Sequence, residues 1–228
     1  SFPTRRSSDL YHIQPLLKIK DVKQLRKEVG LVFQFPEYQL FEETIEKDIA
    51  FGPKNFGVEE TEASQLVRNI LPVVGLDESY LDRSPFELSG GQKRRVAIAG
   101  ILVLDPKVLV LDEPTAGLDP QGAKEMMTLF MRLNREQNKT VLLVTHDMEH
   151  VMKYCDHVIV LDHGAVKQTS DVKTFFEHPE WIVNIGINPP SIIRLKMRLK
   201  EAGFDIPDEI IDEDGLLKCI KRQVKIHE

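Results

Sequence analysis

Residues 108–114 read Val-Leu-Val-Leu-Asp-Glu-Pro, and this stretch decides the fold class. Four consecutive apolar residues of this kind predict a strand that is buried on both faces, as in a parallel sheet. Pro114 ends the strand because it has no N–H to donate to a neighbouring strand. Asp112 and Glu113 are therefore expected at the carboxyl end of the strand, where parallel α/β sheets bind their ligands.

Strand and helix patterns alternate on both sides of this stretch. Strands are expected at residues 29–33, 141–144 and 158–161, the last followed by an Asp-His-Gly turn, and helices at residues 66–74, 92–104 and 124–133. Because strands buried on both faces alternate with helices, the sequence predicts an α/β fold with a mostly parallel sheet. At 228 residues, the chain is long enough for one full domain with a small appendage.

Composition and charge exclude several classes of protein. The net charge is −6, from 30 basic and 36 acidic residues without a basic patch, so we expect no nucleic-acid partner. The longest apolar run, residues 96–104, is about half of what would span a bilayer. Cys155 and Cys219 lie far apart without metal-type spacing, which favours free thiols in a reducing compartment.

A second decisive stretch, Leu-Ser-Gly-Gly-Gln, occupies residues 88–92. Ser89 is a good N-cap for a helix that starts at Gln92, and the two glycines would let a phosphate approach the free N–H groups of that helix. A glycine pair alone is common in loops. Followed by Lys-Arg-Arg, an apolar helix and the Asp-Glu strand, however, this pentapeptide closely resembles the signature motif of ABC ATPases.

The resemblance implies a P-loop NTPase-like fold that works as a sandwich dimer with ATP and Mg²⁺. In that family the signature of one subunit closes over the nucleotide held by the other, so the residues expected to contact a partner's ATP are Ser89, Gly90, Gly91 and Gln92. The Asp-Glu pair resembles a Walker B motif. Asp112 would hold Mg²⁺, usually through water, and Glu113 would orient and deprotonate the attacking water.

Three further motifs fall where the resemblance requires them. Ala-Gly-Leu-Asp-Pro at 116–120 resembles the D-loop, in which Asp119 would cross the dimer interface. His146 resembles the switch histidine that contacts the γ-phosphate and links it to Glu113. Gln34 resembles the Q-loop glutamine that senses Mg²⁺ and the attacking water. Each motif is weak alone, but five in this order and spacing are specific.

The segment after Gln34 narrows the resemblance. Residues 35–54, beginning Phe-Pro-Glu-Tyr-Gln-Leu-Phe, closely resemble the energy-coupling factor ATPases, paired ABC subunits that power the uptake of vitamins and metal ions. In ABC proteins this region receives the coupling helices of the membrane subunit. Its apolar side chains are expected either to line a docking groove or to belong to the core, and they are Leu40, Phe41, Ile45 and Ile49.

The resemblance covers about residues 21–228 and implies a division of the chain. We expect a non-native or disordered leader at 1–10, an ATPase domain at 11–185 with a helical subdomain at about 40–105, and a C-terminal extension at 186–228. Within the extension, Pro-Pro-Ser at 189–191 opens an amphipathic helix that runs to Glu201. An extension of this sort serves ATPase pairing in that family.

The sequence departs from the family pattern before the Q-loop. A P-loop needs a glycine-rich turn ending in Gly-Lys-Ser/Thr, whose N–H groups and lysine hold the phosphates. No glycine precedes Gly30, and none of the 13 glycines is followed by lysine. Since only 33 residues stand before Gln34, we expect a truncated part of a longer ATPase, and these 228 residues alone are expected to bind little or no ATP.

Two functions follow from the resemblance. The first is the ATP-hydrolysing subunit of an energy-coupling factor importer, peripheral at the cytoplasmic face of the cell membrane. Its expected partners are a second ABC ATPase, identical or paralogous, a transmembrane coupling subunit and a substrate-binding membrane subunit. The second function is that of a non-catalytic partner, which lends its signature residues to another subunit's site while its own site stays empty.

Two rival interpretations fit less well. Residues 146–150 match the H-x-x-E-H pattern of inverted zinc peptidases, but that pattern needs both histidines on one helix, and His146 follows an apolar strand pattern. Other ABC-fold ATPases act on DNA or ribosomes. The former carry long heptad insertions, which this sequence lacks, and the latter join two such domains in one chain.

Overall fold

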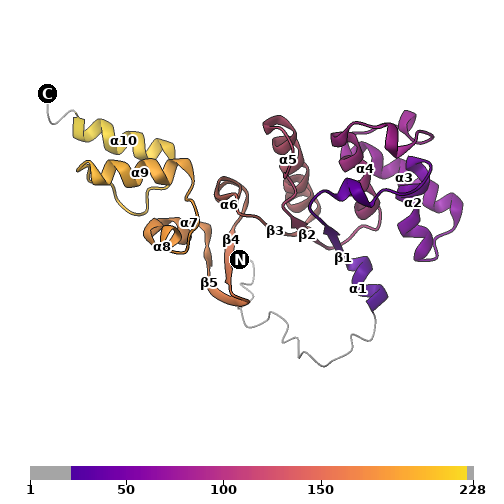
Figure 1. Ribbon diagram of the computed structural model, residues 1–228, viewed down its shortest axis with the longest axis horizontal. Coiled ribbons are helices and arrows are strands. Elements are labelled where there is room, and N and C mark those ends of the chain that lie inside the picture. The colour runs from indigo at the N-terminus through magenta and orange to yellow at the C-terminus, as the bar shows by residue number, and fades with distance from the viewer. Residues whose placement is uncertain (1–21, 225–228) are drawn as a thin grey trace.

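The computed structural model describes residues 22–224, so the expectations for the first ten residues lie outside it. The described strands are β1 (Val29–Val32), β2 (Val108–Asp112), β3 (Thr140–Val144), β4 (His157–Asp162) and β5 (Ala165–Asp171). The described α-helices are α1 (Val22–Glu28), α2 (Ile45–Asn55), α3 (Glu60–Ile70), α4 (Gly90–Leu102), α5 (Pro120–Gln137), α6 (Met148–Tyr154), α7 (Val172–Glu177), α8 (Pro179–Asn184), α9 (Ser191–Glu201) and α10 (Glu213–Val224). Figure 1 shows their arrangement.

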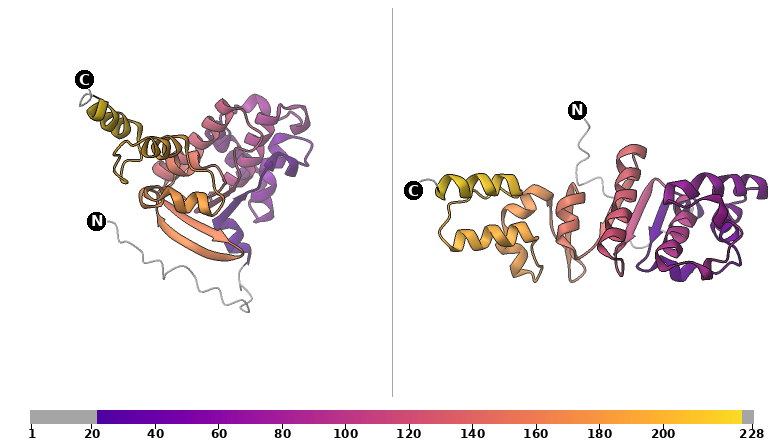
Figure 2. Two further views of the ribbon diagram at one scale, coloured as in Figure 1. Left: turned by 60° about the vertical axis from the view of Figure 1, so that its left-hand side comes forward. Right: turned by 90° about the horizontal axis from the view of Figure 1, so that it is seen from above.

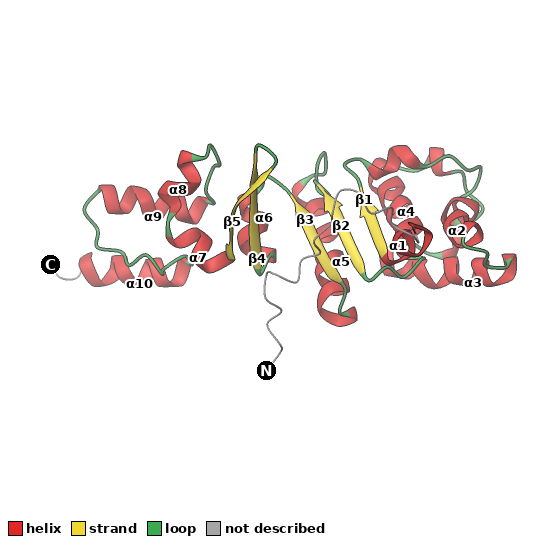
Figure 3. Cartoon of the chain, turned by 90° about the horizontal axis from the view of Figure 1, so that it is seen from below, coloured by secondary structure: helices red, strands yellow, loops and turns green. Residues whose placement is uncertain are grey.

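Strands β1, β2 and β3 form one parallel sheet in that spatial order. Leu111 pairs with Val32 on one side and with Leu143 on the other. The parallel sheet expected from the apolar runs is thus confirmed. Because all three strands run in the same direction, the residues that follow them meet at a single edge of the sheet. Figure 3 shows the three arrows side by side.

Helices α2, α3 and α4 gather beyond β1 at one end of the molecule (Figure 3). These helices, the sheet and α5 enclose one hydrophobic core. Its fully buried side chains include Ile49, Ile98, Leu109 and Phe130. Gly30 of β1 lies so close to α4 that an added Cβ would meet the side chain of Ile101 at 2.7 Å. A side chain there would push β1 away from α4.

Burial settles the two expectations for the apolar segment after Gln34. Leu40, Ile45 and Ile49 are 7%, 0% and 0% exposed, so they belong to the core rather than to a groove. Phe41 is different, since 56% of it is exposed and its ring packs edge-on against Phe51 at 4.8 Å between centroids. An apolar docking surface on this segment can therefore use Phe41, but not the other three.

The strand at 158–161 does not join the parallel sheet, contrary to expectation. Strand β4 pairs antiparallel with β5 in a separate two-stranded sheet. The expected turn is present: Asp162 pairs with Ala165, and the two residues between them, His163 and Gly164, both have positive φ. Such a two-residue loop matches the twist of a hairpin, so the local chemistry favours pairing with the next segment.

Strand β3 is also less buried than the sequence predicts. Its residues alternate, so that Val141 and Leu143 pack toward the core while Leu142 and Val144 are 50% and 54% exposed. The reason is coverage. Helix α5 and the core lie on one face of β3, and within residues 22–224 no strand pairs with its outer edge.

The C-terminal part has a core of its own, separate from that of the sheet. Phe175, Phe176, Ile182 and Ile193, all at most 2% exposed, join α7, α8 and α9. Helix α9 runs from Ser191 to Glu201, as its Pro-Pro-Ser start predicts. Figure 2 shows that these helices lie at the end of an elongated molecule opposite to α2 and α3. No helix in the described residues is long and apolar enough to cross a membrane.

Candidate functional site

The carboxyl ends of the parallel strands bring three of the expected motifs to one edge. Asp112 is the last residue of β2 and pairs with Val144 of β3, two residues before His146. Gln34 follows the end of β1 at Val32 by two residues, and Val32 pairs with Leu111, which lies two residues before Glu113. The sheet therefore assembles the expected Q-loop, Walker B and switch residues from segments about 110 residues apart in sequence.

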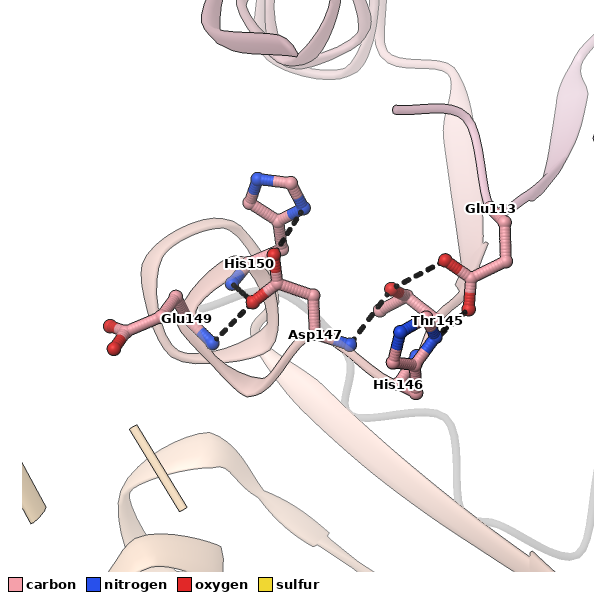
Figure 4. Close-up of polar contacts among 6 residues, drawn as sticks. All are labelled: Glu113, Thr145, His146, Asp147, Glu149 and His150. Carbon is pink, nitrogen blue, oxygen red and sulfur yellow. Dashed lines mark hydrogen bonds and ion pairs between the residues drawn. The ribbon is translucent and has the colours of Figure 1, made fainter. Parts of the chain in front are cut away.

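Glu113 is held at this edge by both strands. Its N–H donates to the carbonyl of Val144 at 2.9 Å, which extends the ladder between β2 and β3 by one residue. Its Oε1 accepts the N–H of His146 at 3.0 Å and lies 2.6 Å from His146 Nδ1, and the Thr145 hydroxyl donates to Oε2 at 3.3 Å (Figure 4). The carboxylate thus has a fixed direction.

The backbone at Glu113 is strained. Its φ is 46°, in the left-handed region that a residue with a long side chain rarely adopts. Such conformations cost roughly 1–3 kcal/mol and cluster at functional sites, where the surroundings enforce them. Here the left-handed turn carries the chain from β2 into the loop before α5 while the Glu113 side chain stays pointed at β3.

His146 is exposed and electrostatically tuned. Its side chain is 91% exposed, whereas that of Glu113 is 21% exposed. The hydrogen bond that the His146 ring donates to Glu113, followed by the negative charge of the same carboxylate, raises the pKa of His146 above its ordinary value. A raised pKa favours the protonated form of this exposed imidazole, and that form suits contact with a phosphate oxygen.

The residues after His146 do not form the zinc pattern. His146 lies before α6, whereas His150 lies inside it and has Nδ1 3.5 Å from Oδ2 of Asp147. Asp147 is the N-cap of α6 and accepts the N–H groups of Glu149 and His150. In the described part of the chain, no group of three or more His, Cys, Asp or Glu side chains is placed to hold a metal by itself.

The signature residues form a capped helix start. Ser89 Oγ accepts the N–H of Gln92 at 3.4 Å, and the Gln92 side chain accepts the N–H of Ser89 at 3.1 Å, which completes a capping box. Helix α4 begins at Gly90 rather than at Gln92, so both glycines belong to its first turn. Both are exposed, and an added Cβ on either would meet nothing within 4 Å.

The expected D-loop residue has a local structural role. Asp119 is the N-cap of α5, and its Oδ1 accepts the N–H of Gly122 at 2.6 Å. Pro120 takes the first helical position, which explains why α5 starts before the expected residue 124. The helix also ends later than expected, at Gln137 rather than at residue 133. Gly117, with φ of 74°, turns the chain between Glu113 and this helix.

Sequence reasoning missed two residues of the site. Thr145 holds Oε2 of Glu113, and Arg94 is 3% exposed and ion-paired with Glu37. A signal for Arg94 was present, because it lies four residues before the buried Ile98 on the apolar face of α4. A charge at such a position must be paired to be buried.

The donors at this edge suit Mg²⁺ and phosphate. Gln34, Asp112 and Glu113 offer the amide and carboxylate oxygens that Mg²⁺ prefers, in the few-ligand manner typical of this ion at phosphate sites. The N-terminus of α4 offers free N–H groups, and its glycines leave open space beside them. The two sets of donors lie on different elements of the chain.

Comparison with known proteins gives consistent similarities. A profile described as "ABC transporter" matches residues 5–116, which include Gln34, Ser89 and Glu113. "Energy-coupling factor transporter ATP-binding protein EcfA2" from Enterococcus faecalis is 52% identical over 213 residues, 93% of this chain and 74% of that protein. The protein of the same name from Ligilactobacillus salivarius is 58% identical over 180 residues, 79% of this chain and 62% of that protein.

Solved structures agree with the sequences. The structure of cbiO1 from Clostridium perfringens, titled part of the ABC transporter complex cbiONQ, has a TM-score of 0.64 and 41% identity, and covers 79% of this chain and 71% of that one. A dimeric ATP-binding cassette, MJ0796 bound to ADP and Pi, has a TM-score of 0.58 and 28% identity over 68% of each chain.

Proposed function

Because this chain belongs to the ABC transporter family of ATPases, we propose that it is the ATP-binding and ATP-hydrolysing subunit of an energy-coupling factor importer. The observation that carries the proposal is the convergence of Gln34, Asp112, Glu113 and His146 at one edge of the sheet. The relatives named as energy-coupling factor ATP-binding proteins support this type of transporter. The cargo that best fits such an importer is a vitamin or a metal ion.

We propose a distinct task for each residue of the home site. Glu113, held by Thr145 and His146, orients water and takes its proton. His146 contacts the phosphate that is being cleaved, and its raised pKa favours the protonated ring that such a contact needs. Asp112 and Gln34 would hold Mg²⁺, directly or through water. When bound, this ion neutralises phosphate charge.

The signature serves a different nucleotide. Ser89, Gly90, Gly91 and Gln92 lie at the exposed start of α4, where free N–H groups and the helix dipole favour an anion. In the capping box, Ser89 Oγ accepts the backbone N–H of Gln92, and the Gln92 side chain accepts the backbone N–H of Ser89. A phosphate of the partner's nucleotide would accept N–H groups that the capping box now occupies. Binding of that nucleotide would therefore exchange hydrogen bonds within the box for hydrogen bonds to phosphate. Asp119, the N-cap of α5, would face the partner as well.

Exposed aromatic residues support a membrane partner beside the Q-loop. Tyr38 is 83% exposed, and Phe41 and Phe51 form an edge-on pair with 56% and 43% exposure. Aromatic side chains of this kind are typical anchors for a partner helix. We propose that the transmembrane coupling subunit docks here, which places the chain at the cytoplasmic face of the membrane beside a second ATPase and a substrate-binding membrane subunit.

One observation favours a second candidate function. The signature is fully formed in the described residues, while residues 1–228 contain no Gly-Lys-Ser/Thr turn. A chain of these residues would then lend its signature to a partner's ATP without hydrolysing ATP in its own site. The two candidates differ in whether Glu113 is needed for turnover.

The test compares two substitutions in the assembled transporter. Glu113→Gln should allow ATP-dependent closure of the ATPase dimer but stop turnover in the home site, because an amide cannot take the proton. Ser89→Arg should block the partner's site by filling the phosphate space. Full ATP hydrolysis by Glu113→Gln, with loss in Ser89→Arg, would replace the first function by the second. Glu136→Gln, on the exposed side of α5, is the matched control for loss of a carboxylate.

A further inference from the structure

Arg94 is the most deeply buried charged side chain near the site, at 3% exposure. Its Nε and Nη2 donate to the two carboxylate oxygens of Glu37 at 2.9 and 2.8 Å, which makes a bidentate pair. Its Nη1 donates to the carbonyl of Ala116 at 2.8 Å and more weakly to that of Pro114 at 3.4 Å. One guanidinium thus contacts two separate segments from the start of α4.

Those two segments belong to the home ATP site. Glu37 lies in the short 3-10 helix Pro36–Gln39, directly after Gln34. Pro114 and Ala116 belong to the loop between Glu113 and Asp119. Helix α4, by contrast, carries the signature that faces the partner's nucleotide. Within one subunit, Arg94 therefore connects the helix that serves the partner's ATP site to two segments of the home ATP site.

An aromatic contact tightens the same junction. The ring of Phe35 lies 5.7 Å from the Arg94 guanidinium carbon, and its Cε1 is 3.1 Å from the place where a Cβ of Gly117 would be. The ring therefore packs against the backbone of the loop. Burial alone would raise the pKa of Glu37, but the hydrogen bonds and charge of Arg94 outweigh it and lower that pKa. Glu37 is thus kept ionised as the fixed partner of Arg94.

We propose that Arg94 is a positioning residue that locks the loop carrying Glu113 and Asp119 to the signature helix, so that movement of one requires movement of the other. Within the loop, the N–H of Ala116 donates to the carbonyl of Glu113 and that of Leu118 to the carbonyl of Thr115. The Arg94 contacts with the two carbonyls hold it on the α4 side. The consequence for catalysis rests on the function proposed above, whereas the order of the loop does not.

Two variants separate this role from ordinary stabilisation. Arg94→Lys keeps a positive charge for Glu37, but its single ammonium group cannot reach both the carboxylate and the loop carbonyls with the planar geometry of a guanidinium. Arg94→Met with Glu37→Gln removes both charges together, so no unpaired charge remains buried. The matched control is Arg95→Met, because Arg95 lies on the same helix but binds Val74 and Glu125, away from the loop.

The first readout is hydrogen exchange at the amides of Ala116 and Leu118 in this chain. Both Arg94 variants should speed exchange there by about tenfold or more, while Arg95→Met leaves it unchanged. The second readout is ATP hydrolysis by the assembled transporter. In the Arg94 variants kcat should fall about tenfold while KM for ATP changes less than about twofold, because orientation rather than binding is lost.

Unchanged exchange at these amides in both variants, each folded as judged by thermal unfolding, would overturn the proposal. So would faster exchange combined with wild-type kcat, because the loop would then move without consequence. Failure of the proposed function is recognised separately. Full ATP hydrolysis by Glu113→Gln would remove the assigned base, and the exchange experiment would still decide whether Arg94 orders the loop.

Discussion

The Oε1 atom of Glu113 lies 2.6 Å from Nδ1 of His146 and also accepts the backbone N–H of the same residue at 3.0 Å. The two residues follow neighbouring parallel strands, so the sheet itself sets their separation. The double contact fixes one side of the carboxylate on His146 and leaves Oε2 with the weaker Thr145 bond. A reacting water is therefore best received at Oε2, the less committed oxygen.

Protonation of His146 should depend on Glu113. Since this carboxylate raises the pKa of His146, the paired state is favoured below the ordinary pKa and is lost as the pH rises through the raised value. The unfolding free energy of wild type should exceed that of His146→Gln at pH of about 5, and the difference should shrink as the pH rises through the raised pKa. The gain is small because the ring is exposed.

NMR titration of the His146 ring gives the direct measurement. Glu113→Gln should move its pKa down toward the ordinary value for histidine, because both the hydrogen bond to a charged group and the charge itself disappear. An unchanged His146 pKa in Glu113→Gln would contradict the contact.

Gly30 should be intolerant of even one extra methyl group. A Cβ would lie 2.7 Å from Ile101, 3.0 Å from Pro106 and 3.1 Å from Leu109, which all belong to the packed core or its rim. Gly30→Ala should cost about 1–3 kcal/mol through overpacking. Urea denaturation measures the change, and an equilibrium stability equal to wild type would show that α4 can move away from β1.

A matched glycine on the facing helix should respond in the opposite sense. Gly100 lies inside α4, and its nearest neighbour to an added Cβ is the Cα of Ile49 at 4.0 Å. Gly100→Ala should therefore stabilise the protein by about 0.5–1 kcal/mol, because alanine loses less backbone entropy in a helix. A loss of stability in Gly100→Ala would mean that α2 and α4 are packed too tightly for a methyl group.

The parallel sheet was predictable because its signal is local. A run such as Val-Leu-Val-Leu followed by Asp-Glu-Pro predicts both that β2 is buried and where it ends. The same logic failed for β4, since an apolar run of the same kind does not specify its partner strand. The positive φ of His163 and Gly164 decides that pairing in favour of a hairpin.

The site was predictable in part for the same reason. Motif residues that end strands, such as Glu113 and His146, meet wherever parallel strands meet, so their proximity follows from the fold class. Arg94 and Glu37 form an ion pair although they lie 57 positions apart in the sequence. No local sequence pattern predicts that these two residues contact each other. The left-handed backbone of Glu113 was also hidden, because a glutamate gives no sign that its φ is positive.

Lys139 should be a stabilising residue despite its distance from the site. It is 8% exposed, and its Nζ donates to Oδ1 of Asp105 at 2.5 Å and to the carbonyl of Pro106 at 2.8 Å. These bonds tie the start of β3 to the loop before β2. Lys139→Met should cost roughly 1–3 kcal/mol, the range for lost hydrogen bonds to a charged group.

Thermal unfolding tests this prediction, with Lys107→Met as the control. Lys107 pairs with Glu28 at 3.3 Å, but its side chain is 75% exposed, so the same substitution should change stability by less than about 0.5 kcal/mol. Equal effects of the two substitutions would mean that burial of Lys139 contributes nothing.

Asp119 can be divided into a capping role and a charge role by two substitutions. Its Oδ1 caps α5 through Gly122, so Asp119→Ala should cost about 1 kcal/mol of stability. Asp119→Asn keeps an equivalent acceptor and should lose only a few tenths of that, from the helix dipole. If the carboxylate also acts across the dimer interface, Asp119→Asn should lower kcat in the assembled transporter while thermal unfolding stays close to wild type. Full hydrolysis by Asp119→Asn would instead restrict the residue to capping, because the amide preserves the cap and removes only the charge.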